Sequence, residues 1–218
     1  MIRTENLCKT YGKGEGAVAA LRNASLEIKD GEMVAIIGKS GSGKTTLLNL
    51  LGGLDKATSG KVFYNDTEIT SLNDEKLADF RLNHIGFVFQ FFDLLPELTA
   101  AENILLPARL TKKSAENYSE IVENLGLSER VNHYPAQLSG GQQQRASIAR
   151  ALINNPDVLL CDEPTGNLDE RSGNEVMDLL LKMNREQNKT ILIVTHNPEI
   201  AKQCGRTIEI SDGEIVFP

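Results

Sequence analysis

Short apolar runs and period-two alternation of apolar and polar residues dominate the first third of the chain, which is the pattern of β-strands. Gly, Asn and Asp residues separate these runs and mark turns. The strands predicted in this part are Ile2–Leu7, Leu21–Ile28, Met33–Ile37 and Lys61–Tyr64. Further strands are predicted at Ile85–Phe89, Val158–Asp162, Ile191–Thr195 and, as a closing hairpin, Thr207–Ile210 and Glu214–Phe217.

Apolar residues at helical spacing, with capping residues before them, fill much of the chain between the later strands. Helices are predicted at Thr45–Leu51, Asn73–Leu82, Thr99–Leu110, Ser114–Leu125, Gly141–Asn154, Ser172–Gln187 and Glu199–Gln203. Nearly continuous apolar strands such as VLLC and ILIV alternate with these helices, which predicts an α/β fold with a parallel sheet covered on both faces.

One region interrupts the alternation of strands and helices. Residues from about 91 to 137 offer helices without a strand, so they are predicted to form an inserted helical subdomain. The whole chain, residues 1–218, is then expected to be a single domain whose core comprises residues 1–90 and 138–218.

Composition narrows the class of protein. A chain of 218 residues with 40% hydrophobic residues can bury a substantial core in one domain. The net charge of −7 argues against a general nucleic-acid binder, because such surfaces carry a basic excess. Cys8, Cys161 and Cys204 are widely spaced and are expected to be reduced thiols. No apolar run approaches the roughly 18 residues of a membrane span, and no secretory signal is evident, so a cytosolic location is expected.

A glycine-rich stretch, GKSGSGKT at Gly38–Thr45, follows an apolar strand and opens a helix, which is the context that a phosphate-binding loop requires. Backbone N–H groups from Ser40 to Thr45 would wrap the β-phosphate, Lys44 would reach the β- and γ-phosphate oxygens, and the Thr45 hydroxyl would ligate Mg²⁺. A glycine-rich turn without a ligand is the disfavoured alternative. The predicted binding residues are Gly38, Lys39, Ser40, Gly41, Ser42, Gly43, Lys44, Thr45 and Thr46.

Adjacent carboxylates end the apolar strand in VLLCDEP, Val158–Pro164. Asp162 can hold Mg²⁺ through water, while Glu163 can orient and polarise an attacking water. Alone, the pair could equally be a solvated turn, but beside a phosphate-binding loop the catalytic interpretation is favoured.

Three further polar or aromatic residues have less specific signals. His196 follows the strand TILIVT and could bond the γ-phosphate or merely cap a loop. Gln90 ends the strand IGFVF, where its amide could touch Mg²⁺ and the attacking water or simply be polar surface. Tyr11, in the glycine-bounded segment KTYGKGEG, could stack on adenine or pack against the protein.

A second candidate phosphate-binding element, LSGGQ at Leu138–Gln142, precedes a helix-like run. A hydroxyl, glycines and unpaired N–H groups at the positive end of a helix suit a phosphate. The stretch nevertheless lacks the lysine that a self-sufficient phosphate cradle would carry, which leaves open whose phosphate it would bind.

GKSGSGKT, Gln90, LSGGQ, LLCDEP, GNLD and His196, in this order, resemble the nucleotide-binding subunit of ATP-binding cassette (ABC) transporters over essentially the whole chain. The loop after Tyr11, GFVFQFFDLLPELTAAENILLP and DEPTGNLD look like the branch of macrolide exporters, lipoprotein-releasing complexes, bacitracin-type peptide-resistance transporters and the cell-division ATPase. The resemblance implies a P-loop NTPase parallel-sheet core, an N-terminal antiparallel β subdomain and an inserted α-helical subdomain.

The resemblance also implies a mechanism. Two subunits would pack head to tail as a homodimer, as in the family, so that one ATP contacts Lys44 of one copy and Ser139, Gly140, Gly141 and Gln142 of the other. Asn167, Leu168 and Asp169 match the loop that crosses this interface, although alone they would pass for a helix-capping turn. ATP and Mg²⁺ would be the cofactors. Catalysis would rest on Glu163, His196, Lys44 and Gln90, with Thr45, Gln90 and Asp162 near the metal.

A separate transmembrane permease subunit is the expected partner, docking beside Gln90 on FFDLLPELTAAENILLP and holding the chain at the inner, cytoplasmic face of the membrane. Phe91, Leu94, Leu95 and Leu98 could equally form the core of the subdomain. The complex would export a peptide, macrolide or lipoprotein, or transmit motion across the membrane. The alternative is a regulatory ATPase of the cell-division type that activates its membrane partner without transport.

Overall fold

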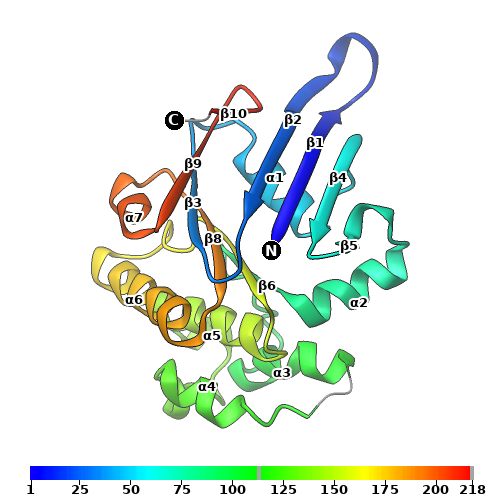
Figure 1. Cartoon of the computed structure of the whole chain (residues 1–218). Coiled ribbons are helices and arrows are strands. Elements are labelled where there is room, and N and C mark those ends of the chain that lie inside the picture. The colour runs from blue at the N-terminus through cyan, green and yellow to red at the C-terminus, as the bar shows by residue number, and fades with distance from the viewer. Residues whose placement is uncertain (112–113, 217–218) are drawn as a thin grey trace. The chain divides into compact units, whose positions relative to one another are not determined.

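The computed structural model describes residues 1–111 and 114–216 (Figure 1). Its contacts group into two compact units, one of Met1–Ala78 with Asn188–Pro218 and the other of Asp79–Gln187. The predicted division into a core and an insertion at about 91–137 stays a prediction.

The first unit contains an antiparallel sheet in the order β2-β1-β4-β5. Its strands are β1 (Ile2–Tyr11), β2 (Val18–Ile28), β4 (Ser59–Tyr64) and β5 (Thr67–Glu68). Ile2 and Ile28 are paired and buried, and Leu7, which follows a register shift after Thr4, is buried as well. β5 was not predicted, because two residues are too short to show a period. The antiparallel N-terminal subdomain is confirmed.

The same unit contains a parallel set of strands. β3 (Met33–Ile37) lies between β8 (Thr190–Val194) and β9 (Arg206–Ser211) and runs parallel to both, and β10 (Glu214–Val216) closes an antiparallel hairpin with β9. Every residue of β8 is buried, and all but the first, Thr190, are apolar. Helices α1 (Lys44–Leu51) and α7 (Pro198–Gln203) follow β3 and β8.

The second unit is built on β6 (Ile85–Phe89) and β7 (Val158–Asp162), which pair in parallel from Ile85 opposite Val158 to Phe89 opposite Asp162. Its helices are α3 (Ala100–Thr111), α4 (Tyr118–Asn124), α5 (Gly140–Leu152) and α6 (Glu170–Gln187). α5 packs closely on β6, since a Cβ on Gly86 would lie 2.7 Å from the Ala151 carbonyl oxygen. Between residues 91 and 137, apart from 112–113, no strand occurs, as predicted.

Helix α2 (Asp74–His84) leads from the first unit into the second. Short 3₁₀ turns occupy Gly14–Gly16, Ile69–Ser71, Ser128–Arg130 and Pro135–Gln137. No helix in the described part of the chain combines the length and the apolar character needed to cross a bilayer.

Many predicted boundaries differ from the structure by one to four residues, and the largest differences are at the end of β1 and the start of α4. The helix predicted at Ser114–Leu125 spans only Tyr118–Asn124, because residues 115–118 form a turn closed by a bond from the Tyr118 N–H to the Ala115 carbonyl. Tyr11 was predicted in a loop but is the last residue of β1, where it pairs with Val18. The predicted end of the last strand, Phe217, lies outside the described residues.

Candidate functional site

The last residue of the glycine-rich loop between β3 and α1 has a backbone conformation that requires glycine. Gly43, the N-cap of α1, has φ +110°, and a Cβ there would lie 2.4 Å from the Ala20 carbonyl oxygen. The neighbouring Gly41 also has a positive φ, +77°, but open space surrounds it. The predicted turn is therefore present, with strand β2 closing one side of it.

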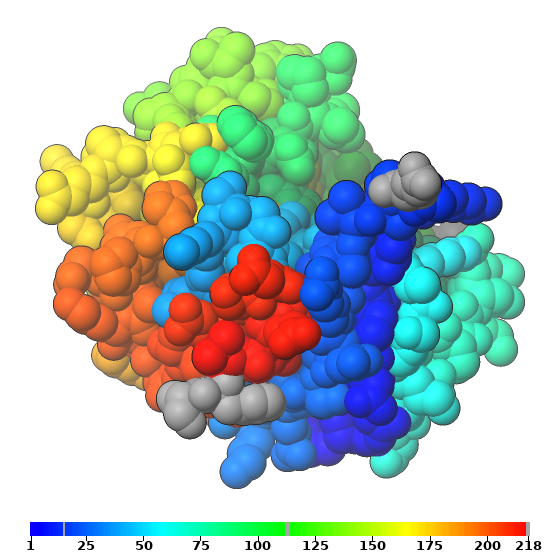
Figure 2. Space-filling model, turned by 90° about the horizontal axis from the view of Figure 1, so that it is seen from above, coloured from blue at the N-terminus to red at the C-terminus, as the bar shows by residue number. Residues whose placement is uncertain are grey.

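Lys44 folds over this loop. Its side chain is largely buried and its Nζ donates to the Gly38 and Lys39 carbonyl oxygens at 2.9 Å each. The β9–β10 hairpin braces the loop, because the Gly213 N–H donates to the Ser42 carbonyl oxygen at 3.0 Å. Figure 2 shows the light-blue segment next to the red hairpin. The ammonium thus lies where the loop backbone converges.

Two other predicted residues belong to the same unit. His196 follows β8 and is exposed, and because β8 runs parallel to β3 it lies at the carboxyl edge from which the glycine-rich loop departs. Tyr11 is 42% exposed, and its hydroxyl donates to Asp55 Oδ2 at 2.8 Å. The unit therefore gathers a phosphate loop, a histidine and an aromatic ring.

The second unit holds the predicted carboxylates. Asp162 ends β7 opposite Phe89, so Gln90 and Glu163 continue from paired positions at one edge. Gln90 and Asn167 exchange two hydrogen bonds, of 3.3 Å from Gln90 Nε2 to Asn167 Oδ1 and of 3.0 Å from Asn167 Nδ2 to the Gln90 carbonyl. A Cβ on Gly166 would lie 2.8 Å from Gln90 Nε2, so a larger residue there would displace that amide.

Glu163 has a left-handed backbone, with φ +48°, which is uncommon for a residue that is not glycine. A turn from the Gly166 N–H to the Glu163 carbonyl, 3.0 Å, and a bond from Gln144 Nε2 to the Pro164 carbonyl, 2.7 Å, hold this strained conformation. Strain of this kind gathers at functional sites, where the surrounding structure over-determines it.

The LSGGQ element is the capped start of α5. Ser139 Oγ accepts from the Gln142 N–H at 3.3 Å, while Gln142 Oε1 accepts from the Ser139 N–H at 3.0 Å. This reciprocal capping box uses both polar side chains of the element. The N–H groups of Gly140 and Gly141, in the first turn, have no partner within the helix. They are the donors that remain for a phosphate.

Asp169 caps α6 through the Ser172 N–H and hydroxyl, at 3.0 and 2.7 Å. These bonds to the Ser172 backbone and side chain lower the pKa of the Asp169 carboxyl. The helix-capping turn considered from sequence is thus present. The additional part that Asp169 would play at a subunit interface stays a prediction.

Arg150 is a residue that sequence reasoning missed. From the last turn of α5 its guanidinium donates to the carbonyl oxygens of Phe92, at 2.9 Å, and Asp93. Burial lowers the pKa of Arg150, and the Asp93 carboxylate offsets part of that effect. Phe92 and Asp93 both have positive φ, so the arginine holds an irregular backbone. No local signal links a helical arginine to a loop so far away in sequence.

The segment that starts at Phe91 was predicted either to dock a partner or to form a core. Phe91 is 74% exposed and Leu95 43%, while Leu94 and Leu98 are half-buried. None of the four side chains is fully buried in the single chain. The surface alternative therefore has the stronger support within this unit.

A buried parallel strand, a glycine-rich loop with a lysine folded over it, a helix opened by that loop, and a carboxylate at the end of another parallel strand define a P-loop nucleoside triphosphatase. The Ser-Gly-Gly-Gln element that caps the start of α5 distinguishes this chain from P-loop proteins that lack such an element.

The ABC transporter family model matches residues 21–166, and the chain belongs to that family. It is 44% identical over 220 residues to the lipoprotein-releasing system ATP-binding protein LolD of Syntrophus aciditrophicus, covering 99% of both chains. It is 49% identical to the macrolide export ATP-binding/permease protein MacB of Shigella flexneri, covering 99% of this chain and 34% of MacB.

Among solved structures, a dimeric post-hydrolysis state of the ATP-binding cassette MJ0796 bound to ADP and Pi, from Methanocaldococcus jannaschii, superposes with a TM-score of 0.92. The identity is 44%, over 100% of this chain and 97% of that one. The protein is accordingly an ABC ATP-binding subunit with the cassette fold, and it binds and hydrolyses ATP.

Proposed function

We propose that this chain hydrolyses ATP as one half of a head-to-tail homodimer, in which the LSGGQ element of one copy completes the ATP site on the phosphate-binding loop of the other. The observation that carries the proposal is the complementarity of the two elements. The loop has Lys44 folded over it, whereas the LSGGQ element has capped side chains, unpaired N–H groups at Gly140 and Gly141, and no cation of its own. The dimeric state of MJ0796 supports this arrangement.

In the proposed site, the N–H groups of residues 40–45 and the Lys44 ammonium bind the phosphates, with Thr46 in the next position of α1. Tyr11 stacks on the adenine, for which its exposed ring at the end of β1 is suited. The phosphate end and the base end of the nucleotide are thereby assigned to residues of one unit.

Hydrolysis is assigned to residues at the strand ends. Glu163 orients the attacking water and accepts its proton, His196 donates to the γ-phosphate, and the Gln90 amide contacts the same water. Lys44 compensates the negative charge that moves toward the leaving ADP. Asp169, fixed as the cap of α6, lies in the loop assigned to contact the second copy.

Mg²⁺ is the cofactor proposed to accompany ATP. The assigned donors are the Thr45 hydroxyl, the Gln90 amide and the Asp162 carboxylate, which are oxygen ligands of the kind that Mg²⁺ takes together with phosphates. Within residues 1–111 and 114–216, no group of three or more His, Cys, Asp or Glu side chains is placed to hold a metal ion. Bound there, the ion would neutralise charge on the β- and γ-phosphates.

A separate permease is the proposed membrane partner. The exposed Phe91 and Leu95 offer an apolar contact for a permease helix, next to Gln90. Arg150 binds the carbonyl groups just beyond Phe91, and its helix α5 begins at the LSGGQ element. One rigid helix therefore connects the assigned ATP contact with the assigned docking loop.

This contact would hold the chain at the cytoplasmic face of the membrane, where ATP binding and hydrolysis drive export or transmit motion. The names of LolD and MacB point to a lipoprotein or a macrolide as the class of substrate. The regulatory alternative of the cell-division type has no observation that favours it over transport.

Glu163→Gln tests the proposal. The amide keeps the shape of the side chain but cannot accept a proton, so ATP binding is expected to persist while steady-state hydrolysis falls by at least about a hundredfold. Gel filtration with MgATP is then expected to show a stable dimer.

The matched control is Glu170→Gln, which changes an exposed glutamate in the first turn of α6. It should leave hydrolysis within about twofold of the unchanged chain, as is usual for surface sites. Near-normal ATPase activity in Glu163→Gln would remove it as the base, and a strictly monomeric Glu163→Gln at saturating MgATP would refute the dimer.

A further inference from the structure

Tyr11 is part of a compact cluster with Lys9 and Asp55. Lys9 and Tyr11 are two residues apart on β1 and so project from the same face of the strand. Lys9 Nζ donates to Asp55 Oδ1 at 2.5 Å, and the Tyr11 hydroxyl donates to Asp55 Oδ2 at 2.8 Å. Each carboxylate oxygen therefore holds one residue of the strand.

Lys9 also covers the aromatic ring. Its Nζ lies 4.8 Å from the centroid of the Tyr11 ring, within the range of a cation–π contact. Only 12% of the Lys9 side chain is exposed, so this contact is poorly hydrated and correspondingly strong. Because Tyr11 itself is 42% exposed, the ring has a side covered by the ammonium and a part still open to solvent.

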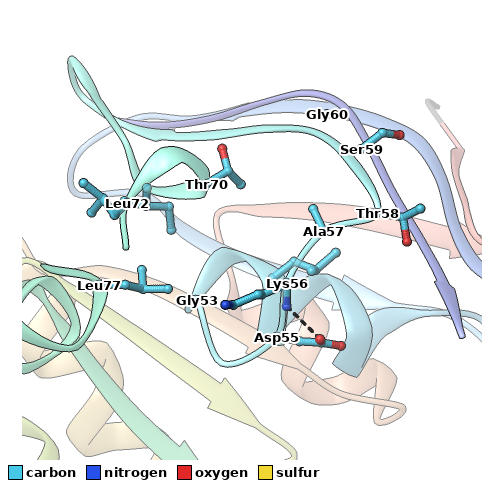
Figure 3. A pocket seen from close by; sticks show the side chains of 12 residues that line it. Gly53, Asp55, Lys56, Ala57, Thr58, Ser59, Gly60, Thr70, Leu72 and Leu77 are labelled. Carbon is cyan, nitrogen blue, oxygen red and sulfur yellow. Dashed lines mark hydrogen bonds between the residues drawn. The ribbon is translucent and has the colours of Figure 1, made fainter. Parts of the chain in front are cut away.

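Asp55 is itself held in place. Its Oδ1 accepts from the Lys56 N–H at 2.7 Å, drawn as a dashed line in Figure 3, and the Lys56 carbonyl accepts from Lys9 Nζ at 2.7 Å. Asp55 and Lys56 lie at a cavity of about 340 Å³ whose apolar lining includes Leu50, Ile69 and Leu77. Asp55 lies in the turn just after the carboxyl end of α1, which is the helix that the phosphate-binding loop opens.

Protonation agrees with this arrangement. Burial raises the pKa of Asp55, but the hydrogen bonds from Lys9, Tyr11 and the Lys56 N–H outweigh it and hold the pKa below its usual value. Burial and the Asp55 contact raise the pKa of the Tyr11 hydroxyl against the opposing bond from Thr46. At neutral pH the carboxylate is charged and the phenol keeps its proton, so both bonds to Asp55 persist.

From this geometry we infer that Lys9 and Asp55 are positioning residues for the nucleotide base: they clamp the Tyr11 ring, cover one face with an ammonium and present the other face to a purine. The inference rests on the proposed stacking of adenine on Tyr11. The clamp reduces the freedom that the ring would lose on stacking. The ammonium also draws π-electron density toward its own side, which reduces repulsion between the open face and the π-electrons of the base.

The chain contains a matched control on β4. Lys61 Nζ lies 6.0 Å from the centroid of the Phe63 ring, also two residues away, and is paired with Glu68 Oε2 at 3.0 Å. The arrangement of lysine, aromatic ring and carboxylate is repeated, but no nucleotide role is assigned to it. The Lys61 side chain is 52% exposed, so its loss should be tolerated.

The experiment measures, by calorimetry on the full chain with Mg²⁺, the dissociation constants of ADP, which carries the base, and of inorganic pyrophosphate, which does not. Lys9→Met and Asp55→Asn are each expected to raise the dissociation constant of ADP about fivefold. Tyr11→Ala is expected to raise it about tenfold, since base stacking contributes about 1–3 kcal/mol. The dissociation constant of pyrophosphate should change by less than about twofold in each variant, because the phosphate-binding loop is intact.

Lys9→Arg should keep ADP affinity within about twofold of that of the unchanged chain, since arginine keeps the cation over the ring. Lys61→Met should bind ADP as the unchanged chain does. A double variant, Lys9→Met with Tyr11→Ala, should be no weaker than Tyr11→Ala alone, as expected of residues that act through one ring. Circular dichroism before each titration verifies that the variant is folded.

Three results would overturn the clamp. Loss of pyrophosphate and ADP affinity together would place the effect on the phosphate loop. Unchanged ADP affinity in both Lys9→Met and Asp55→Asn, with a loss in Tyr11→Ala, would reject the clamp and leave the stacking intact. Unchanged ADP affinity in Tyr11→Ala would instead reject the stacking itself, and the inference with it.

Discussion

The chain presents phosphate-binding geometry at the starts of two helices, and the two are built differently. At α1 the N-cap is Gly43, with no side-chain cap, and Lys44 bonds two carbonyl groups of the loop. At α5 the N-cap is Ser139, which shares a reciprocal box with Gln142 and has no lysine in reach within the element.

In the proposed dimer, this difference would let one helix start bind a phosphate by itself, while the other would contribute to a site on the second copy. A glycine N-cap with positive φ leaves the loop backbone free to curve around an anion, and the lysine supplies the charge. A capping box instead fixes the start of α5 and satisfies its side chains, so only the glycine N–H groups remain. The second element is rigid and presents few donors, as suits a part that engages a phosphate already bound elsewhere.

The largest effect should follow from Gly43→Ala. Its Cβ would lie 2.4 Å from the Ala20 carbonyl oxygen at φ +110°, so the loop must move. The free energy of unfolding should fall by at least about 2 kcal/mol, measured by urea titration, and calorimetry should show loss of ATP binding.

Gly41→Ala is the matched control, because its φ is also positive but nothing lies near its Cβ. It should lose only about 1 kcal/mol from the backbone conformation. Equal losses in the two variants would mean that the contact with Ala20 has no part in shaping the loop.

Gly140→Ala should separate the two helix starts by function. A Cβ there would meet Leu168 at 3.5 Å, an ordinary contact, so folding should be unchanged. Calorimetry should find ADP affinity within about twofold of the unchanged chain, whereas steady-state ATPase activity should fall at least about tenfold, because the methyl group crowds the remaining donors. Weakened ADP binding together with a normal turnover number would reverse the roles assigned to the two helices.

The smallest effect should come from Ser139. Ser139→Ala removes the side-chain acceptor of the Gln142 N–H and should lower stability by about 1 kcal/mol, whereas Ser139→Gly should cost only a few tenths. Thermal unfolding of the two variants in parallel measures the difference. Melting temperatures of both variants equal to that of the unchanged chain would show that the capping box contributes nothing to α5.

Much of the fold follows from local pattern. The bounds of β3, β6 and β7 match the predicted ones because these strands are short and almost entirely apolar, with Asp162 at the end of β7 as the exception. The glycine-rich loop is equally local, since its turn and its lysine lie within a few consecutive residues. The start of α4 and the pairing of Tyr11 in β1 were missed, because a turn at Ala115 and a partner at Val18 decided them.

The sequence by itself determined the alternation of strands and helices, the glycine-rich loop, and the polar residues at the carboxyl ends of β6, β7 and β8. These features depend on neighbours in the chain and on a period of two or 3.6 residues. Only the tertiary structure decided that Arg150 holds the carbonyls of Phe92 and Asp93, and that Asp55 holds Lys9 and Tyr11. Those contacts join residues far apart in sequence, and no local periodicity records which distant side chains folding will bring together.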